Sequence, residues 1–271
     1  MAKVKFLKRD EIESATLCLL ADYGRKYGAL AVPPVPVEEI LEAHLGLTLD
    51  FDDLRTRLGT PDVLGATWIQ DKAVLVDEAL DPTGDRLREG RYRFTLAHEI
   101  GHWELHRHGF LANAGHPSLF GDKPAPSIVC RSGSRNDPME WQADTFSGYL
   151  LMPKEMVLAA WQRRFGSLTP YIAKDEIADL SAKWGLADDQ QPTVDAAKEM
   201  ARVFNVSGQA MQIRLIGLGL VRTEQPPPDL FDATSSVSSA IGREGEALAK
   251  PLAISAYGGH REGFWKEKMP V

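Results

Sequence analysis

The sequence contains few cysteines and no long apolar run. Only Cys18 and Cys130 occur among 271 residues, too few for the disulfide framework of a small secreted domain. The N-terminal stretch is interrupted by charged residues and lacks an apolar core followed by a cleavage site, and no run of about 18 apolar residues occurs. We therefore expect a cytoplasmic protein with no membrane-spanning segment.

The sequence also lacks an excess of basic residues. Lys and Arg total 31 against 38 Asp and Glu, which gives a formal net charge of -7. Because a negative surface repels phosphate backbones, nucleic acid is not expected as the main partner. The apolar fraction of 44% and the charged fraction of 25% are those of an ordinary globular protein.

The spacing of apolar residues predicts a mixed α+β fold with a small sheet. Alternation predicts a strand over residues 47–51 and a hairpin over residues 64–78, with its turn at Asp71 and Lys72. An edge of this hairpin near the later motif could hold an extended peptide, although an ordinary sheet strand is the simpler interpretation. A loop is expected over residues 109–138. Helices are expected over residues 10–26, 36–45, 140–151, 155–165 and 174–184.

Residues 193–220 predict two helices with a turn near residues 206–208, a helix-turn-helix-like shape or a plain helical hairpin. If this pair bound DNA, Arg202 and Arg214 would be its contact residues. The Pro, Ser and Gly content after residue 222 indicates a linker and tail. We accordingly expect three parts, at residues 1–165, 166–222 and 223–271.

The pentapeptide His98-Glu99-Ile100-Gly101-His102 carries the chemistry. On a helix, residues four apart lie on one face, so His98 and His102 can bind one metal ion. Glu99 beside them would take a proton from water and later deliver it to the leaving amine. The apolar residues around the motif, and the lack of proline there, favour the helix. We therefore predict a zinc site with Glu99 as general base.

A catalytic zinc ion needs a third protein ligand. His106 is about 12 Å along the helix from His98, too far to share the ion, and is expected at the surface or beside a ligand. His108 has a metzincin-like spacing, but Leu105 stands where that pattern needs glycine. Glu140 on the next helix is favoured, although it also fits a helix start.

Asp144 lies one turn after Glu140 on the same helical face. From there its carboxylate can accept a hydrogen bond from a ligand histidine and orient the ring. This pairing favours the ligand role of Glu140 over a simple capping role.

The segment FTLAHEIGH followed by EWQADTFSGYLLMP resembles the ImmA/IrrE family of metallo-endopeptidases. The resemblance is good over residues 35–153 and weaker over residues 193–220. It implies a zincin-like core and then a helix-turn-helix-like region. It also implies His98, His102 and Glu140 as zinc ligands and Glu99 as general base.

The resemblance further implies the cleavage of a helix-turn-helix repressor, which relieves transcriptional repression during stress or mobile-element induction. The alternatives are a DNA-binding regulator and a metal-bound stress sensor without proteolysis. Cys130 could ligate zinc or act as an inhibitory thiol, although a packed thiol is the simpler interpretation. Donors to the reaction's oxyanion would come from Tyr149, His106, Arg131 or Tyr171, among which sequence does not choose.

Overall fold

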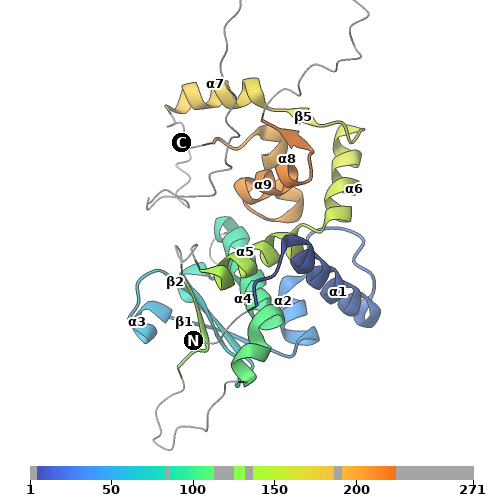
Figure 1. Ribbon diagram of the computed structural model, residues 1–271. Helices are drawn as coiled ribbons and strands as arrows, with labels where there is room; N and C mark the ends of the chain where they lie inside the picture. The colour runs from blue at the N-terminus through green and yellow to red at the C-terminus, as the bar shows by residue number, and fades with distance from the viewer. Residues whose placement is uncertain (1–4, 84–85, 113–124, 132–136, 186–190, 224–271) are drawn as a thin grey trace, which may run out of the picture. The chain divides into compact units, whose positions relative to one another are not determined.

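A small sheet and two helices packed against each other form the centre of the fold. We describe it from a computed structural model over residues 5–83, 86–112, 125–131, 137–185 and 191–223. The chain divides into two units, Met1–Gln225 and Pro226–Val271, and all described elements belong to the first. That unit is a mixed α+β structure, mostly helical, with a small sheet (Figure 1). In the described part of the chain, every helix is too short or too polar to cross a membrane.

The predicted helices are present with shifts of a few residues at their ends. Regular helices are α1 (Arg9–Tyr27), α2 (Val37–Glu39), α3 (Leu54–Leu58), α4 (Arg86–Ala112), α5 (Pro138–Leu151), α6 (Lys154–Phe165), α7 (Lys174–Trp184), α8 (Asp195–Phe204) and α9 (Gly208–Gly217). Two short segments are the π-helical η1 (Ile40–His44) and the 3₁₀ turn η2 (Glu78–Leu80). Helix α1 begins earlier than predicted because the Glu11 carboxylate accepts a hydrogen bond from the Lys8 N–H at 2.8 Å.

The main sheet has the strand order β1-β3-β2-β4, and a second sheet pairs β5 with β6. Its strands are β1 (Thr48–Asp52), β2 (Val63–Trp68), β3 (Ala73–Asp77) and β4 (Ile128–Arg131), and the short strands are β5 (Tyr171–Ile172) and β6 (Val221–Arg222). Strand β1 runs parallel to β3, whereas β2 is antiparallel to both β3 and β4. The predicted hairpin is therefore present with both strands inside the sheet, which agrees with an ordinary pair of sheet strands and not with a peptide-binding edge.

The hairpin turn is longer than the sequence predicted. Four residues, from Ile69 to Lys72, separate the paired ends Trp68 and Ala73. Ile69 is 1% exposed and packs in the hydrophobic core although it lies in the turn. Lys72 completes the turn with a φ of 51°.

The expected loop over residues 109–138 is wrong in part. Helix α4 continues to Ala112, and β4 adds a strand to the sheet within the expected loop. The run Ile-Val-Cys-Arg of β4 shows no alternation of apolar and polar residues, which is the pattern that predicts a half-buried strand. Residues 113–124 and 132–136 of that loop lie outside the described residues.

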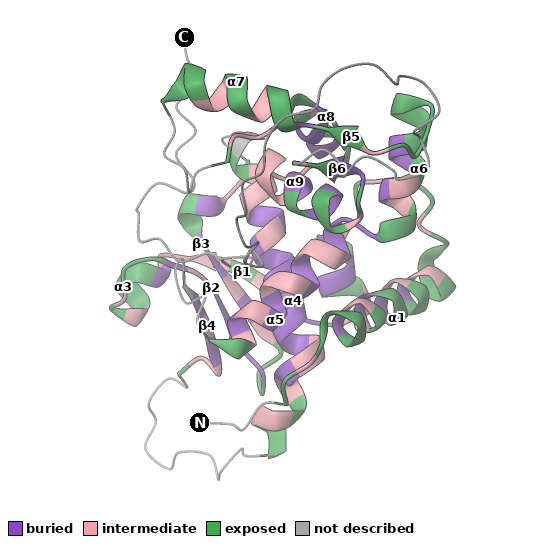
Figure 2. Ribbon diagram, turned by 45° about the horizontal axis from the view of Figure 1, so that its top comes forward, coloured by how far each residue is buried: buried purple, intermediate pink, exposed green. Residues whose placement is uncertain are grey.

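Helices α4 and α5 pack closely against each other, and α4 also contacts β2 and β3. Figure 2 shows buried residues along both helices, whereas α7 has none. The close approach depends on Gly101 inside the pentapeptide. A Cβ added there would lie 3.2 Å from the Ala143 Cα and 3.2 Å from Phe146 Cβ. The glycine thus allows α5 to lie near the histidines of α4.

Helices α8 and α9 form the predicted pair, joined through Asn205 at φ 54° and capped at Ser207. Arg202 is exposed, but Arg214 is buried. The predicted DNA-contact role of Arg214 is therefore corrected, because its guanidinium is used within the protein. The zincin-like core, the helix-turn-helix function and the three predicted parts remain predictions.

Arg214 binds α9 to distant parts of the chain. Its Nε donates to the Met152 carbonyl at 3.0 Å, and its Nη2 donates to Glu13 Oε1 at 2.8 Å. The guanidinium also lies 4.4 Å from the centre of the Tyr149 ring. These contacts join α9 to α1 and to the C-terminal end of α5.

We predict that Arg214→Leu lowers the free energy of unfolding by about 1–3 kcal/mol. The variant leaves a buried carbonyl and the Glu13 carboxylate without their donor, although the partial exposure of Glu13 reduces the cost. Urea unfolding measures the change. Arg202→Leu on the exposed face of α8 is the matched control, with an expected change within about 0.5 kcal/mol. Equal losses in the two variants would contradict the structural role of Arg214.

Candidate metal centre

Helix α4 presents His98, Glu99 and His102 in the interior of the protein. Their exposed fractions are 2%, 0% and 0%. The helix runs unbroken through the motif, so the two histidines point the same way one turn apart. Their Nε2 atoms lie 2.9 Å from each other. The structure thus brings together the two predicted histidine ligands.

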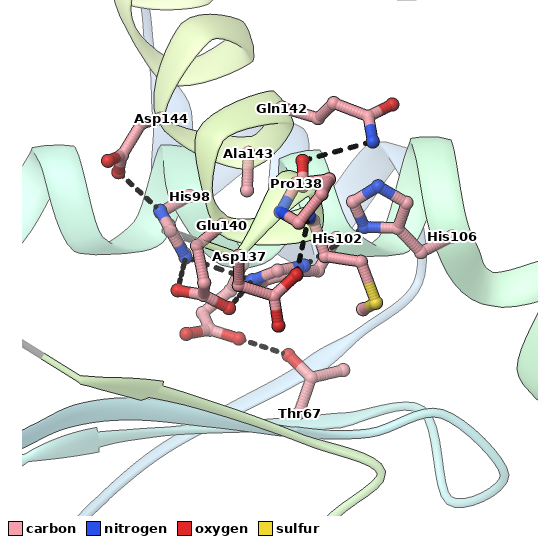
Figure 3. A network of polar contacts seen from close by, with 12 residues as sticks. Thr67, His98, His102, His106, Asp137, Pro138, Glu140, Gln142, Ala143 and Asp144 are labelled. Carbon is pink, nitrogen blue, oxygen red and sulfur yellow. Dashed lines mark hydrogen bonds and ion pairs between the residues drawn. The ribbon is translucent and has the colours of Figure 1, made fainter. Parts of the chain in front are cut away.

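Helix α5 brings Glu140 to the same point. Asp137 caps this helix by accepting from the Met139 N–H at 2.8 Å, and Pro138 occupies its first turn. The Glu140 carboxylate does not complete that cap. Its Oε2 lies 3.3 Å from His98 Nε2, and its Oε1 lies 3.2 Å from His102 Nε2. Figure 3 shows the three side chains converging from the two helices.

The donor set fits a metal ion. Two imidazole nitrogens and a carboxylate face one another in a buried space, where their lone pairs repel unless a proton or cation lies between them. Two histidines and one carboxylate form an established set for catalytic zinc. Ligand atoms of His98, His102 and Glu140 all lie within 4.8 Å of one another. These residues could therefore hold the ion that the sequence predicts.

Each ligand histidine has a different partner on its other nitrogen. His98 Nδ1 lies 2.9 Å from Asp144 Oδ1, as expected for an orienting carboxylate. His102 Nδ1 lies 3.0 Å from His106 Nδ1. His106 is 1% exposed, so its expected position beside a ligand agrees with the structure and the surface alternative is wrong.

The contact between His102 and His106 determines which nitrogen of each ring carries its proton. If His102 Nε2 faces an ion, its proton lies on Nδ1 and is donated to His106 Nδ1. His106 must then carry its own proton on Nε2. That atom is buried and has no hydrogen-bond partner in the described structure. His106 thus orients His102 at the cost of one unsatisfied donor.

Strand β2 of the sheet positions Glu99, the predicted base. The Thr67 hydroxyl on β2 donates to Glu99 Oε2 at 2.5 Å, whereas Glu99 Oε1 is buried with no partner in the described structure. A Cβ added to Gly65 would lie 2.5 Å from Glu99 Oε1. Glycine at residue 65 therefore leaves room for the free oxygen. Thr67, which points from the sheet toward the histidines in Figure 3, holds the other oxygen.

Burial and hydrogen bonding shift the ionisation of the site in opposite directions. Burial raises the pKa of Glu99, which suits a group that must take and return a proton. Burial also acts to raise the pKa of Glu140, but hydrogen bonds from His102 and His98 overcome this effect and lower it to about 2. Burial acts to lower the pKa of His98, yet Cys130, Asp144 and Glu140 around the ring raise it well above the ordinary value.

Cys130 is a further buried group at this site. It lies on β4, and its thiol shares a hydrogen bond with His98. Burial raises the pKa of the thiol to about 11, so without metal it is neutral at physiological pH. The sequence left its role open between a ligand and a packed thiol.

Among the described side chains, His108, Tyr149 and Tyr171 are exposed or engaged elsewhere. His108 is exposed on the continuing helix, as the presence of Leu105 predicted. Tyr149 stacks under Arg214, and the Tyr171 hydroxyl is exposed and donates to Glu176 at 2.8 Å. The side chain of Arg131 lies outside the described residues. The oxyanion donor therefore remains unassigned.

Thr67, Gly65 and the packing role of Gly101 are not evident from the sequence alone. Thr67 and Gly65 lie two apart on a strand before the motif, a pattern common to ordinary strands. Only the pairing of β2 beneath α4 gives them a role. Gly101 could have been questioned, since glycine in a helix interior costs about 1 kcal/mol relative to alanine.

One comparison identifies a related family. Residues 84–215 match the family model of the IrrE N-terminal-like domain of peptidase M78. The matched segment contains α4, α5 and all the converging ligands. No curated protein matches the chain.

We predict that Asp144→Asn weakens the binding of Zn²⁺, used as the probe ion, by about 10–100-fold. The amide can still accept the proton of His98 but no longer supplies a negative charge beside the ring. Competition with a chelator measures the affinity. Asp179→Asn on the exposed face of α7 removes the same charge far from the histidines and should bind as the wild type does. Unchanged affinity in Asp144→Asn would reject the orienting role.

The buried His106 makes the stability of the metal-free protein depend on pH. Burial and the neighbouring His102 lower the pKa of His106 from 6.5 to about 3. As pH falls, the His106 ring binds a proton in the unfolded chain before it does so in the folded chain. The stability that the neutral ring contributes is therefore lost as pH falls from 6.5 towards 3. In metal-free protein, the free energy of unfolding should fall less steeply with decreasing pH in His106→Gln than in the wild type. The difference in slope should be up to about 1.4 kcal/mol per pH unit. Urea unfolding from pH 7 to pH 5 tests this.

His108→Gln makes the same chemical change on the exposed side of α4 and is the control. An equal slope for wild type and His106→Gln would show that the ring is not buried as described.

Proposed function

We propose that this chain, which belongs to the ImmA/IrrE family through its IrrE N-terminal-like domain, is a zinc-dependent endopeptidase. One observation carries the proposal. His98, His102 and Glu140 converge within hydrogen-bonding distance of one another beside a Glu99 carboxylate that keeps one oxygen free. This arrangement supplies both a metal set and a base.

Zinc is the ion that this donor set suits best. His98, His102 and Glu140 would hold the ion as three protein ligands, which would leave it open to water or substrate. Zinc, when bound, lowers the pKa of a coordinated water molecule and polarises the carbonyl of the scissile bond. The remaining chemistry belongs to the residues of the chain.

Glu99 is suited to move the proton. Thr67 holds Oε2, so Oε1 is the oxygen that can accept a proton from water. Burial raises the pKa of Glu99 and makes the protonated carboxyl stable enough to protonate the leaving amine. The base thus works from a fixed position set by the sheet.

The surrounding residues maintain the ligand geometry. Asp144 holds the ring of His98, and His106 holds that of His102. Because these partners keep the rings' second nitrogens engaged, both Nε2 atoms stay directed to the point that Glu140 faces.

We propose a protein of the helix-turn-helix repressor type as the substrate, cleaved in the cytoplasm to relieve transcriptional repression during stress or mobile-element induction. The support is the resemblance of the two sequence blocks to the ImmA/IrrE family. The DNA-binding alternative has less support. The net charge is -7, and Arg214 is engaged with Glu13 and Met152.

The test is cleavage by a Glu99→Gln variant. We expect the variant to keep about one zinc per chain, because the ligands are intact, and to lose cleavage by at least about 10²-fold, because the amide cannot accept the proton. Each form is coexpressed with helix-turn-helix repressors encoded nearby, and fragment masses are measured.

Glu104→Gln on the same helix is the matched control and should retain cleavage. Cleavage by Glu99→Gln at the wild-type rate would reject the mechanism. Metal binding without cleavage of any tested protein by the wild type would instead favour the silent sensor.

A further inference from the structure

A second set of ligand atoms lies beside the first. One atom each from His98, Glu99 and Cys130 lie within 4.8 Å of one another, and all three residues are buried. The set shares His98 with the first set but contains neither His102 nor Glu140. Nothing in the proposed hydrolysis uses the thiol.

The strand register explains why the thiol faces the site. Cys130 on β4 is paired with Gly65 on β2, and residues paired across antiparallel strands project to the same face. Thr67, two residues further along β2, reaches Glu99 from that face. The thiol therefore points toward α4, next to a glycine that has no side chain to cover it.

The free oxygen of Glu99 is an independent sign of a ligand. Glu99 is 0% exposed, and its Oε1 has no hydrogen-bond partner in the described structure. Buried carboxylate oxygens are seldom left without a partner. Water or a cation would satisfy this atom, and the Cys130 thiol and the His98 nitrogen supply the other donors that a cation needs.

The two sets differ in the ions they favour. A thiolate selects softer ions such as Zn²⁺ and Cd²⁺, whereas a set without sulfur discriminates less in their favour. Cysteine, histidine and carboxylate are all ordinary zinc ligands. Because Asp144 engages Nδ1 of His98, Nε2 is the nitrogen left for either set, and the two sets therefore exclude each other.

We propose that His98, Glu99 and Cys130 form a second, inhibitory metal position for thiophilic divalent cations. An ion held there uses the Glu99 carboxylate as a ligand, so the base can no longer accept a proton from water. The same ion draws His98 away from His102 and Glu140. The inhibitory consequence rests on the proposed peptidase function, but the metal position itself does not.

Cadmium is the probe. One equivalent of Cd²⁺ added to the metal-free full chain should give a sulfur-to-cadmium charge-transfer absorption in the wild type. Cys18→Ser, which removes the exposed cysteine of α1, should keep the band, and Cys130→Ser should lose it. A band that persists in Cys130→Ser, or that disappears in Cys18→Ser, overturns the proposal.

Two further variants separate the second set from a thiolate that joins the first set. Glu140→Gln should keep the band, since Glu140 is not in the proposed set, and Glu99→Gln should weaken Cd²⁺ binding at least tenfold. Loss of the band in Glu140→Gln overturns the proposal. Should Cys130→Ser fail to fold, the cadmium NMR shift of the wild type reports sulfur ligation directly, and a shift typical of nitrogen and oxygen ligands alone overturns it.

The activity readout distinguishes failure of this inference from failure of the proposed function. Cd²⁺ should inhibit cleavage by the zinc-loaded wild type at least tenfold more strongly than cleavage by zinc-loaded Cys130→Ser. A cysteine-dependent band without any cleavage leaves the metal position standing and rejects the peptidase. Cleavage that Cd²⁺ inhibits equally in both forms rejects the inhibitory position.

Discussion

The close packing of α4 against α5 is the constraint on which the site depends. The three converging ligands come from these two helices, so their distances are set by the separation of the helix axes. Gly101 and Ala143 set that separation, because any side chain at residue 101 meets the backbone of the facing helix. The same glycine that weakens the helix locally thus permits a buried set of two imidazoles and a carboxylate.

The two ligand histidines are oriented by partners that differ in charge and in exposure. His98 rests on Asp144, whose side chain is 42% exposed, whereas His102 rests on the fully interior His106. Solvent can stabilise the carboxylate but cannot reach the orphaned nitrogen of His106. One ligand is therefore oriented by charge and the other by packing, and the two should respond differently to salt and to mutation of the core.

The helices and the site residues that depend on spacing within one helix could be predicted from the sequence. Spacing on one helix pairs His98 with His102, and the i+4 pairing with Asp144, together with the family resemblance, indicates Glu140. The position of Cys130 was beyond such reasoning, because it depends on a four-residue strand pairing with β2 across more than sixty residues of sequence. Burial of Arg214 was equally hidden, since its partner Glu13 lies 201 residues away.

Arg214 has a consequence for how such a chain can change through evolution. It lies within the matched segment, residues 84–215, and its guanidinium engages the Met152 carbonyl just after the helix that carries Glu140. Helices α8 and α9 therefore cannot be replaced by an unrelated segment unless the replacement supplies an equivalent donor to the Met152 carbonyl. Substitutions in α9 are then tied to substitutions at the end of the helix that carries Glu140, and the two must change together.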